Sequence, residues 1–336
     1  MSRVAILGAG AFGTALALFC HREGHEVRVW CFEEELPATI AAAGQNTVYL
    51  PGFPLPPQVL FTADGAAVLA AADLVLIVIP AQFVRSALRR FRDLFPETAV
   101  IGFCAKGIEH DSLKLMSEIA AEELAGPTSR HVFLSGPTFA KELALGLPMD
   151  ITAASRPGGA ARAAQAILHR SRFRVYTSED PTGVEVAGAL KNVIAIACGT
   201  ADELGMGLSA RASLLSRGLA ELTRFGVALG ADPVTFLGLS GVGDLLLTCT
   251  APLSRNYSLG RAIGRGGNAK ELLASQKAIA EGYYTAKPAW LLARRVGIDA
   301  PITEQIYHVL YEGRPLSEAI RQLMAREPKD ELAGIR

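Results

Sequence analysis

The residues that most strongly suggest chemistry are a lysine and an aspartate, each placed in an otherwise apolar helical stretch. Lys191 interrupts the run from Gly188 to Ile194, and Asp244 precedes three consecutive leucines. An unpaired charge in an apolar interior costs roughly several kcal/mol, so a folded chain pairs it, shifts its pKa or opens a cleft beside it. Two opposite charges on separate elements are most simply explained as partners. A paired, partly desolvated lysine is suited to proton transfer, which makes Lys191 and Asp244 candidate catalytic residues.

Two plainer interpretations of these residues remain open. Lys191 could pack only its aliphatic stem and extend its ammonium group to solvent. The two residues could also form a structural ion pair that takes no part in chemistry. The residues around them do not decide between these alternatives.

A polar triplet follows the aspartate by ten residues. Ser254 is well placed to cap a helix that the pattern predicts from Tyr257, and Arg255 and Asn256 come directly after the serine. A helix start beside an arginine is a natural phosphate site, and Thr248 could add a hydroxyl donor. Taken alone, such a triplet is more often a capped helix that binds nothing.

Two loops after predicted strands supply further candidates. One is Cys104-Ala-Lys106-Gly107, and the other runs from Leu134 to Glu142. Ligands of doubly wound sheets bind at the carboxyl ends of strands, so Lys106 could reach a substrate or a cofactor bound there. An exposed loop lysine usually does neither. Glu281 is a carboxylate followed directly by Gly282, and this pair alone does not indicate a function.

The elements that must position these residues divide the chain in two. Short apolar runs alternate with helical patterns in the N-terminal half, which is typical of a parallel sheet with crossover helices. Residues 1–180 are therefore predicted to form an α/β, doubly wound domain and residues 181–336 an all-α domain. Strands are expected at Val4–Leu7, Glu26–Trp30, Leu74–Ile79, Val100–Phe103, Val132–Ser135, Asp150–Ala153 and Arg174–Tyr176. Helices are expected at Thr182–Leu204 and Ser209–Leu229, with shorter ones after Pro233, Pro288 and Pro301, whereas Leu50–Pro57 should be a non-helical surface loop.

A glycine fingerprint follows the first predicted strand. Gly8, Gly10 and Gly13 have the spacing G-x-G-x-x-G and open an alanine-rich helix that ends near Gly24. The first glycine permits the tight turn, the second lets the backbone approach a pyrophosphate, and the third lets helix and strand pack closely. This context predicts a Rossmann-like domain that binds a dinucleotide.

Cofactor choice should depend on the residues after the second strand. Cys31-Phe32-Glu33-Glu34-Glu35 contains no arginine or lysine. A ribose hydroxyl suits a carboxylate, whereas a 2′-phosphate needs a cation, so NAD(H) is preferred and NADP(H) remains possible. The three glutamates could equally be a solvated helix start, and both interpretations can hold together.

Composition narrows the class of partner. The 336 residues are 50% hydrophobic and 20% charged, with 33 Lys and Arg against 33 Asp and Glu. Because the net charge is zero, no overall electrostatic field favours binding to nucleic acid or to an anionic membrane, which leaves a small-molecule site. The longest apolar run is Leu74–Pro80, which is too short to span a bilayer, so a cytoplasmic protein without integral membrane association is predicted. Neither a metal site nor a disulfide is expected from the five well-separated cysteines, Cys20, Cys31, Cys104, Cys198 and Cys249.

Together these segments resemble the NAD(P)-dependent glycerol-3-phosphate dehydrogenases over nearly the whole chain. The resemblance implies a homodimeric cytoplasmic enzyme that interconverts dihydroxyacetone phosphate and sn-glycerol 3-phosphate and feeds phospholipid synthesis when it runs toward reduction. The motifs that carry it are the glycine fingerprint, Asn46-Thr-Val-Tyr-Leu-Pro-Gly52, Lys106-Gly-Ile108, Ser135-Gly-Pro-Thr-Phe-Ala140, Leu190-Lys-Asn192, Gly241-Val-Gly-Asp244, Ser254-Arg-Asn256 and Glu281-Gly282.

The resemblance also implies roles for individual residues. Lys191 would be the acid and base on the C2 oxygen, with Asp244 as its partner. The substrate site would be completed by Lys106, Gly136, Thr138, Thr248, Ser254, Arg255 and Asn256. The cofactor-contacting positions would be Gly8, Gly10, Ala11, Phe12, Gly13, Phe32, Lys106, Ala140, Arg255, Ile279 and Glu281.

Two departures from the bacterial pattern stand out. Serine and tryptophan are replaced by Ala11 and Phe12, which keeps a small residue and an aromatic one. The basic residues common after the second strand are replaced by Cys31-Phe32 and the glutamates, as in the NAD-specific eukaryotic branch. Two alternatives stay open: a related reductase of the 6-phosphogluconate or hydroxyisobutyrate dehydrogenase kind, and a non-catalytic redox sensor that binds NAD(H).

Overall fold

Two compact units make up the protein. The computed structural model describes residues 1–274, 280–328, 330–331 and 334. Two short segments that follow strands of the first unit belong to the second. Unit 1 consists of Met1–Ala105, Met116–Leu134 and Thr138–Pro181, and unit 2 of Lys106–Leu115, Ser135–Pro137 and Thr182–Arg336.

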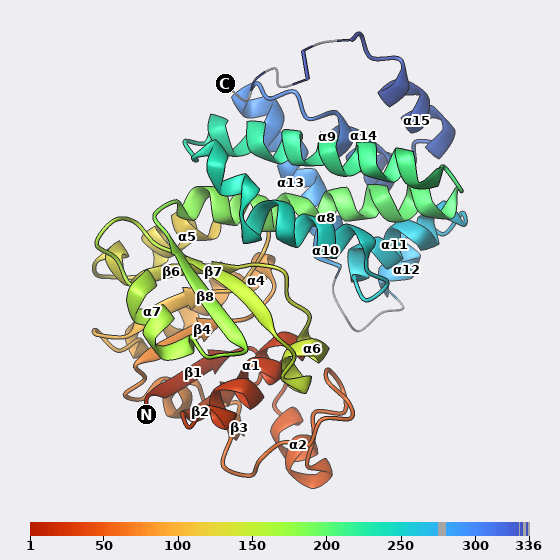
Figure 1. Cartoon of the computed structure of the whole chain (residues 1–336). Coiled ribbons are helices and arrows are strands. Elements are labelled where there is room, and N and C mark those ends of the chain that lie inside the picture. Colours follow the sequence, from red (N-terminus) through yellow and green to blue (C-terminus); the bar gives the residue numbers. More distant parts are fainter. Residues whose placement is uncertain (275–279, 329, 332–333, 335–336) are drawn as a thin grey trace. The chain divides into compact units, whose positions relative to one another are not determined.

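Unit 1 is built on an eight-stranded sheet (Figure 1). Its strand order, β3-β2-β1-β4-β5-β6-β7-β8, reverses direction next to β1, as in doubly wound dinucleotide-binding folds. Neighbouring strands from β3 through β6 pair in parallel, as do β7 and β8. The strands are β1 Arg3–Leu7, β2 Glu26–Trp30, β3 Leu60–Thr62, β4 Leu74–Ile77, β5 Val100–Phe103, β6 His131–Ser135, β7 Met149–Ala154 and β8 Phe173–Ser178.

Helices cover both faces of this sheet because successive strand residues point to opposite sides. Val4 and Ile6 of β1 pack into one cluster with α1, α6 and α7. Ala5 and Leu7 pack into the other cluster with α3, α4 and α5. The helices of unit 1 are α1 Ala11–Arg22, α2 Leu36–Ala43, α3 Gly65–Leu69, α4 Ala81–Phe91, α5 Met116–Glu123, α6 Ala140–Leu145 and α7 Ala161–Leu168.

The predicted α/β fold of the N-terminal half is confirmed, with small differences in the strands. Strand β3 was not predicted, because it has only three residues and Leu60 is exposed at the sheet edge. Strand β4 ends at Ile77, two residues earlier than expected. The segment Leu50–Pro57 is non-helical as predicted, although Leu50 itself is buried.

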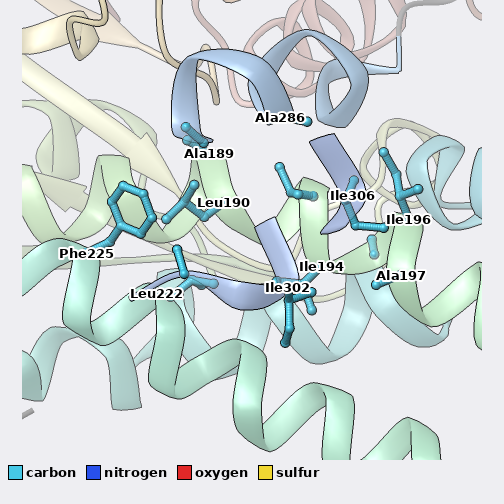
Figure 2. Close-up of a cluster of buried hydrophobic side chains, with 14 of the residues drawn as sticks. Ala189, Leu190, Ile194, Ile196, Ala197, Leu222, Phe225, Ala286, Ile302 and Ile306 are labelled. Carbon is cyan, nitrogen blue, oxygen red and sulfur yellow. The ribbon is translucent and has the colours of Figure 1, made fainter. Parts of the chain in front are cut away.

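Unit 2 is helical, and its core surrounds α8. Figure 2 shows Leu190 and Ile194 of α8 in one apolar cluster with Leu222, Phe225 and Ile302 of neighbouring helices. The helices are α8 Pro181–Glu203, α9 Gly207–Ala228, α10 Asp244–Thr250, α11 Arg255–Gly264, α12 Ala269–Ala274, α13 Glu281–Val296, α14 Pro301–Glu312 and α15 Leu316–Met324; a 3-10 turn, Pro233–Leu237, and a π turn, Leu239–Gly243, precede α10.

Two close contacts fix the helices of this core. A Cβ at Gly199 would lie 2.0 Å from the Tyr257 carbonyl oxygen, so α8 and α11 can approach this closely only because the residue is glycine. The buried carboxylate of Glu221 in α9 accepts the backbone N–H groups of Ile302 and Thr303, both at 2.9 Å. Glu221 thereby caps the start of α14 from another helix.

Two expectations about the helical half need correction. Pro288 lies inside α13 and does not precede a helix; α13 begins at Glu281. The helix after Ser254 begins at Arg255, two residues before the predicted start. In the part of the chain that the structure describes, α8 is long and apolar enough, by length and composition alone, to cross a membrane. Its apolar window is entirely buried within the structure, as in a core helix.

Candidate functional site

The predicted pair of charges in unit 2 is present. Lys191 Nζ donates a hydrogen bond to Asp244 Oδ1 at 2.5 Å and another to Thr248 Oγ1 at 2.7 Å. Asp244 begins α10 and Thr248 follows one helical turn later, so both side chains lie on the same side of that helix. Lys106 Nζ donates to the other carboxylate oxygen, Asp244 Oδ2, at 2.7 Å and to the Gly136 carbonyl at 3.1 Å. One carboxylate thus holds two ammonium groups.

This cluster is removed from solvent. Asp244 is 0% exposed and Lys191 6% exposed, whereas the Lys106 side chain retains 18% of its surface. The cluster carries two positive charges and one negative charge, so the anionic partner already present does not neutralise it. The unbalanced positive charge suits an anionic ligand.

The burial and the charges shift the pKa of both partners. Desolvation lowers the pKa of Lys191 from its usual value to about 8; the positive charge of Lys106 adds to this effect, and Asp244 opposes it. Burial alone would raise the pKa of Asp244, but Lys106 and Lys191 outweigh it and hold that pKa below its usual range. A lysine that titrates near pH 8 can both release and accept a proton near neutral pH.

The stem of Lys106 reaches this carboxylate across a glycine of α8. A Cβ at Gly188 would lie 3.4 Å from Lys106 Cγ and 2.9 Å from Ser135 Oγ. Only the contact with Ser135 is too close, so a side chain at position 188 would make the serine hydroxyl move. The Lys106 stem would lie at ordinary van der Waals distance from that Cβ.

A chain of amide hydrogen bonds adjoins the cluster. Asn192 Nδ2 donates to the carbonyls of Lys106, at 3.4 Å, and Gly188, at 3.3 Å. Asn256 Nδ2 donates to Asn192 Oδ1 at 2.8 Å, and the backbone N–H of Gly282 donates to Asn256 Oδ1 at 2.9 Å. The chain links α11 and the start of α13 to the backbone of Lys106, so it fixes both asparagine side chains.

The polar triplet at the start of α11 serves more than one purpose. Ser254 is the N-cap predicted from the sequence, because its Oγ accepts the Tyr257 N–H at 3.3 Å. Arg255 is exposed, and its charge interacts with the carboxylate of Glu281. Asn256 is buried in the amide chain. Of the three side chains, Arg255 is the one most open to a ligand.

The glycine turn of unit 1 meets the steric requirements of a dinucleotide fingerprint. Gly8 has φ +122°, and a Cβ there would lie 2.5 Å from the Val78 carbonyl oxygen. A Cβ at Gly13 would lie 1.9 Å from the Gly8 carbonyl oxygen, whereas one at Gly10 would meet nothing within 4 Å. The open side at Gly10 is the N-cap of α1, which has no side-chain cap and no acidic residue in its first turn. These features fit a pyrophosphate held by helix N–H groups.

The structure also shows on which elements the other predicted cofactor-contacting residues lie. Ala11 and Phe12 begin α1 and are partly buried, and Phe32 is 73% exposed after β2. Ala140 is the first residue of α6, and Thr138 lies two residues before it. Ile279 lies outside the described residues.

Comparison with known proteins agrees with both halves of this description. Residues 3–161 match the model of the NAD-dependent glycerol-3-phosphate dehydrogenase N-terminus, and residues 180–321 match that of the C-terminus. The chain belongs to this family. Both halves of the chain match one dehydrogenase family, which supports that enzyme over the related reductases and the sensor left open above.

Individual glycerol-3-phosphate dehydrogenase family members are similar over their full length. The chain is 45% identical to the glycerol-3-phosphate dehydrogenase (NAD(P)+) of Geobacter sp. (strain M21), with 98% of each chain covered. It is 43% identical to that of Pseudoalteromonas translucida, again with 98% of each covered. The crystal structure of glycerol-3-phosphate dehydrogenase from Coxiella burnetii superposes with a TM-score of 0.92 at 37% identity, covering 97% of this chain and 99% of that one.

The geometry gathers most of the predicted substrate residues but adds one that sequence reasoning missed. Lys106, Gly136, Lys191, Asp244 and Thr248 form one cluster, as described above. Asn192 appears in the sequence analysis only within the motif Leu190-Lys-Asn192, without a role of its own. Its place beside Lys191 in that motif was the available signal. Among the described residues no group of three metal-ligating side chains is present.

Proposed function

We propose that the protein is a glycerol-3-phosphate dehydrogenase that transfers a hydride reversibly between NAD(H) and dihydroxyacetone phosphate, giving sn-glycerol 3-phosphate. The observation that carries the proposal is the buried Lys191 ammonium, held by Asp244 and Thr248 with a pKa of about 8. When bound, the reduced nicotinamide supplies the hydride that adds to C2 of the ketone. The chain's own residues hold the substrate and move the proton.

Lys191 is the proton donor in the direction of reduction. As an ammonium group it donates its proton to the C2 oxygen as negative charge develops there, and it takes the proton back in oxidation. Asp244 keeps the ammonium form populated at neutral pH by opposing the desolvation that lowers the Lys191 pKa. Thr248 fixes the direction of the ammonium group by accepting one of its hydrogen bonds.

The substrate phosphate binds to the positive side of unit 2. Lys106 and Lys191 leave the cluster with one excess positive charge, and Arg255 adds an exposed guanidinium that can bind phosphate through two hydrogen bonds. Asn192 and Asn256 position the Lys106 backbone through their amide chain. The remaining proposed substrate residues are Gly136, Thr138 and Ser254.

The cofactor binds at the glycine turn of unit 1 and is NAD(H) in preference to NADP(H). Support comes from the open N-cap at Gly10 and from the glutamates after β2, where a 2′-phosphate would need a cation. In this assignment residues 1–180 bind the dinucleotide, and residues 181–336 carry substrate binding, catalysis and dimerisation. The further proposed contacts are Gly8, Ala11, Phe12, Gly13, Phe32, Lys106, Ala140, Arg255, Ile279 and Glu281.

The wider role is part of the same proposal. We infer a cytoplasmic homodimer that supplies sn-glycerol 3-phosphate for glycerophospholipid synthesis. The support is membership of the family together with a pair of charges and a cofactor turn suited to its reaction. Gel filtration with light scattering checks the dimer.

The direct test is the loss of reduced-nicotinamide absorbance by the purified protein with dihydroxyacetone phosphate, run in parallel with NADH and NADPH. Rapid oxidation of NADH with slow oxidation of NADPH is the expected result. Equal rates with both cofactors would keep the enzyme assignment and reject the NAD(H) preference. No oxidation of either cofactor would reject the reaction itself.

A further inference from the structure

A fully buried asparagine hydrogen-bonds a segment of unit 1 that follows α2 to the glycine turn. Asn46 Nδ2 donates to the Ala9 carbonyl at 2.8 Å and to Thr14 Oγ1 at 2.9 Å. Thr14 Oγ1 itself donates to the Ala9 carbonyl at 3.2 Å. Because Asn46 is 0% exposed and bonded on both sides of the turn, the segment has one fixed position relative to the turn.

The same segment also holds a carboxylate after β2. The Tyr49 N–H donates to Asn46 Oδ1 at 3.1 Å, and the Tyr49 hydroxyl donates to Glu33 Oε1 at 2.5 Å. The hydrogen bond to Glu33, with burial, raises the pKa of Tyr49 to about 12, so the hydroxyl keeps its proton at physiological pH. Tyr49 thus connects the position of Glu33 to the glycine turn through a short rigid path.

The charge of Glu33 is held in place without being neutralised. Within the part of the chain that the structure describes, no lysine or arginine forms an ion pair with Glu33. Glu33 is partly exposed and follows the exposed Phe32. It comes twenty residues after Gly13, the separation at which doubly wound folds place the acidic residue that bonds a ribose 2′-hydroxyl. An ionised carboxylate there accepts a hydroxyl and repels a phosphate.

We propose that Tyr49 is a specificity-determining residue, which holds Glu33 in the position where its charge rejects the 2′-phosphate of NADPH. The Tyr49 hydroxyl stops the carboxylate from turning out to solvent, where salt would screen it. The inference rests on the proposed function, because it requires a dinucleotide at the glycine turn. The proposal requires more than an acidic charge somewhere after β2, because the Glu33 carboxylate must be held by the Tyr49 hydroxyl.

The test measures binding with the full chain, so it does not depend on turnover. Calorimetric titration with ADP-ribose and with 2′-phospho-ADP-ribose gives the ratio of the two dissociation constants for the wild type, Tyr49→Phe, Glu33→Gln and the double variant. We expect Glu33→Gln to reduce the preference for ADP-ribose by about tenfold or more, and Tyr49→Phe to reduce it by about threefold or more. In the Glu33→Gln background, Tyr49→Phe should change the ratio no further, because Tyr49 acts through Glu33.

Glu34→Gln is the matched control, since it removes the same charge one residue later from an exposed side chain. It should leave the ratio within about twofold of the wild type. An equal effect of Glu34→Gln and Glu33→Gln would overturn the proposal, because a held position would then be irrelevant. An unchanged ratio in Tyr49→Phe would overturn it as well. If Tyr49→Phe does not fold, Glu33→Asp replaces it, because it keeps the charge and shortens the side chain that reaches the Tyr49 hydroxyl; a wild-type ratio in Glu33→Asp would then overturn the proposal.

Failure of the proposed function would look different. If the wild type binds neither ADP-ribose nor its 2′-phosphate, dinucleotide binding itself is wrong. If the wild type binds both and the variants leave their ratio unchanged, dinucleotide binding stands and the role of Tyr49 is rejected.

Discussion

Replacing Asp244 by asparagine removes the one carboxylate that holds both ammonium groups of the site. The substitution keeps the shape of the side chain and leaves Lys191 and Lys106 facing an uncharged amide. Breaking a buried ion pair by removing one partner costs about 3–5 kcal/mol, so stability must be measured along with activity. The expected chemical effect is on the pKa of Lys191.

Asp244→Asn should lower the pKa of Lys191, as the groups that set this pKa in the wild type show. Desolvation and the charge of Lys106 lower the pKa to about 8, and Asp244 alone among the larger influences raises it. Without the carboxylate the pKa falls further, by about 1–3 units for an opposite charge at this distance. Each unit corresponds to about 1.4 kcal/mol. Near pH 7 the lysine of the variant would be largely neutral and unable to donate a proton.

The assay is the pH dependence of kcat/KM for reduction of dihydroxyacetone phosphate. The wild-type rate should fall as pH rises through about 8, because the protonated lysine is the reactive form. In Asp244→Asn the fall should move to lower pH by about one unit or more. An alkaline limb at the same pH in both proteins would refute the assignment of the proton to Lys191.

A second aspartate controls for the loss of an ion pair in the same unit. Asp202 Oδ2 accepts hydrogen bonds from Arg211, at 2.8 Å, and Tyr257, at 2.7 Å, outside the site. Asp202→Asn should lower the melting temperature without moving the pH profile. A shifted profile in this control would mean that the effect reflects loosened packing.

Three further predictions follow from other features. Arg255→Ala should raise KM for dihydroxyacetone phosphate by about 10- to 100-fold, because a charged phosphate contact is worth roughly 1.5–3 kcal/mol; unchanged kinetics would reject the phosphate assignment. Gly10→Ala should fold normally and lose NADH binding, measured by fluorescence titration. Gly13→Ala should instead destabilise unit 1, because its Cβ would lie 1.9 Å from the Gly8 carbonyl oxygen. Equal melting temperatures of the two variants would contradict this difference. Glu221→Ala should lower the free energy of unfolding by about 3 kcal/mol, measured by urea denaturation, because it leaves two buried backbone N–H groups without an acceptor; a loss under about 0.5 kcal/mol would show that water replaces the carboxylate.

Local pattern was enough to predict most of the sheet. Strands such as β1 and β4 are apolar on both faces, because helices cover both sides, so they appear as short apolar runs bounded by turns. Strand β3 has only three residues at an edge, none of them buried, and no local pattern marks it. Pro288 was misread because a proline inside a helix resembles a helix boundary in the sequence.

The chemistry of the site was predictable only in part. Lys191 and Asp244 could be paired because each is a costly charge in an apolar helix. The contact of Lys106 with Asp244 depends on the segment after β5 packing with unit 2, which no local pattern encodes. The amide chain through Asn192 joins residues 64 positions apart in the sequence, so it too required the tertiary structure.

The measurement that tests the central claim most directly is single-turnover reduction of dihydroxyacetone phosphate by Lys191→Ala alongside its NADH affinity. The account predicts a loss of the reduction rate by about 10²–10⁴-fold, with NADH bound as tightly as by the wild type. A variant that binds NADH and still reduces the ketone at the wild-type rate would contradict the account, because Lys191 would then not be the proton donor.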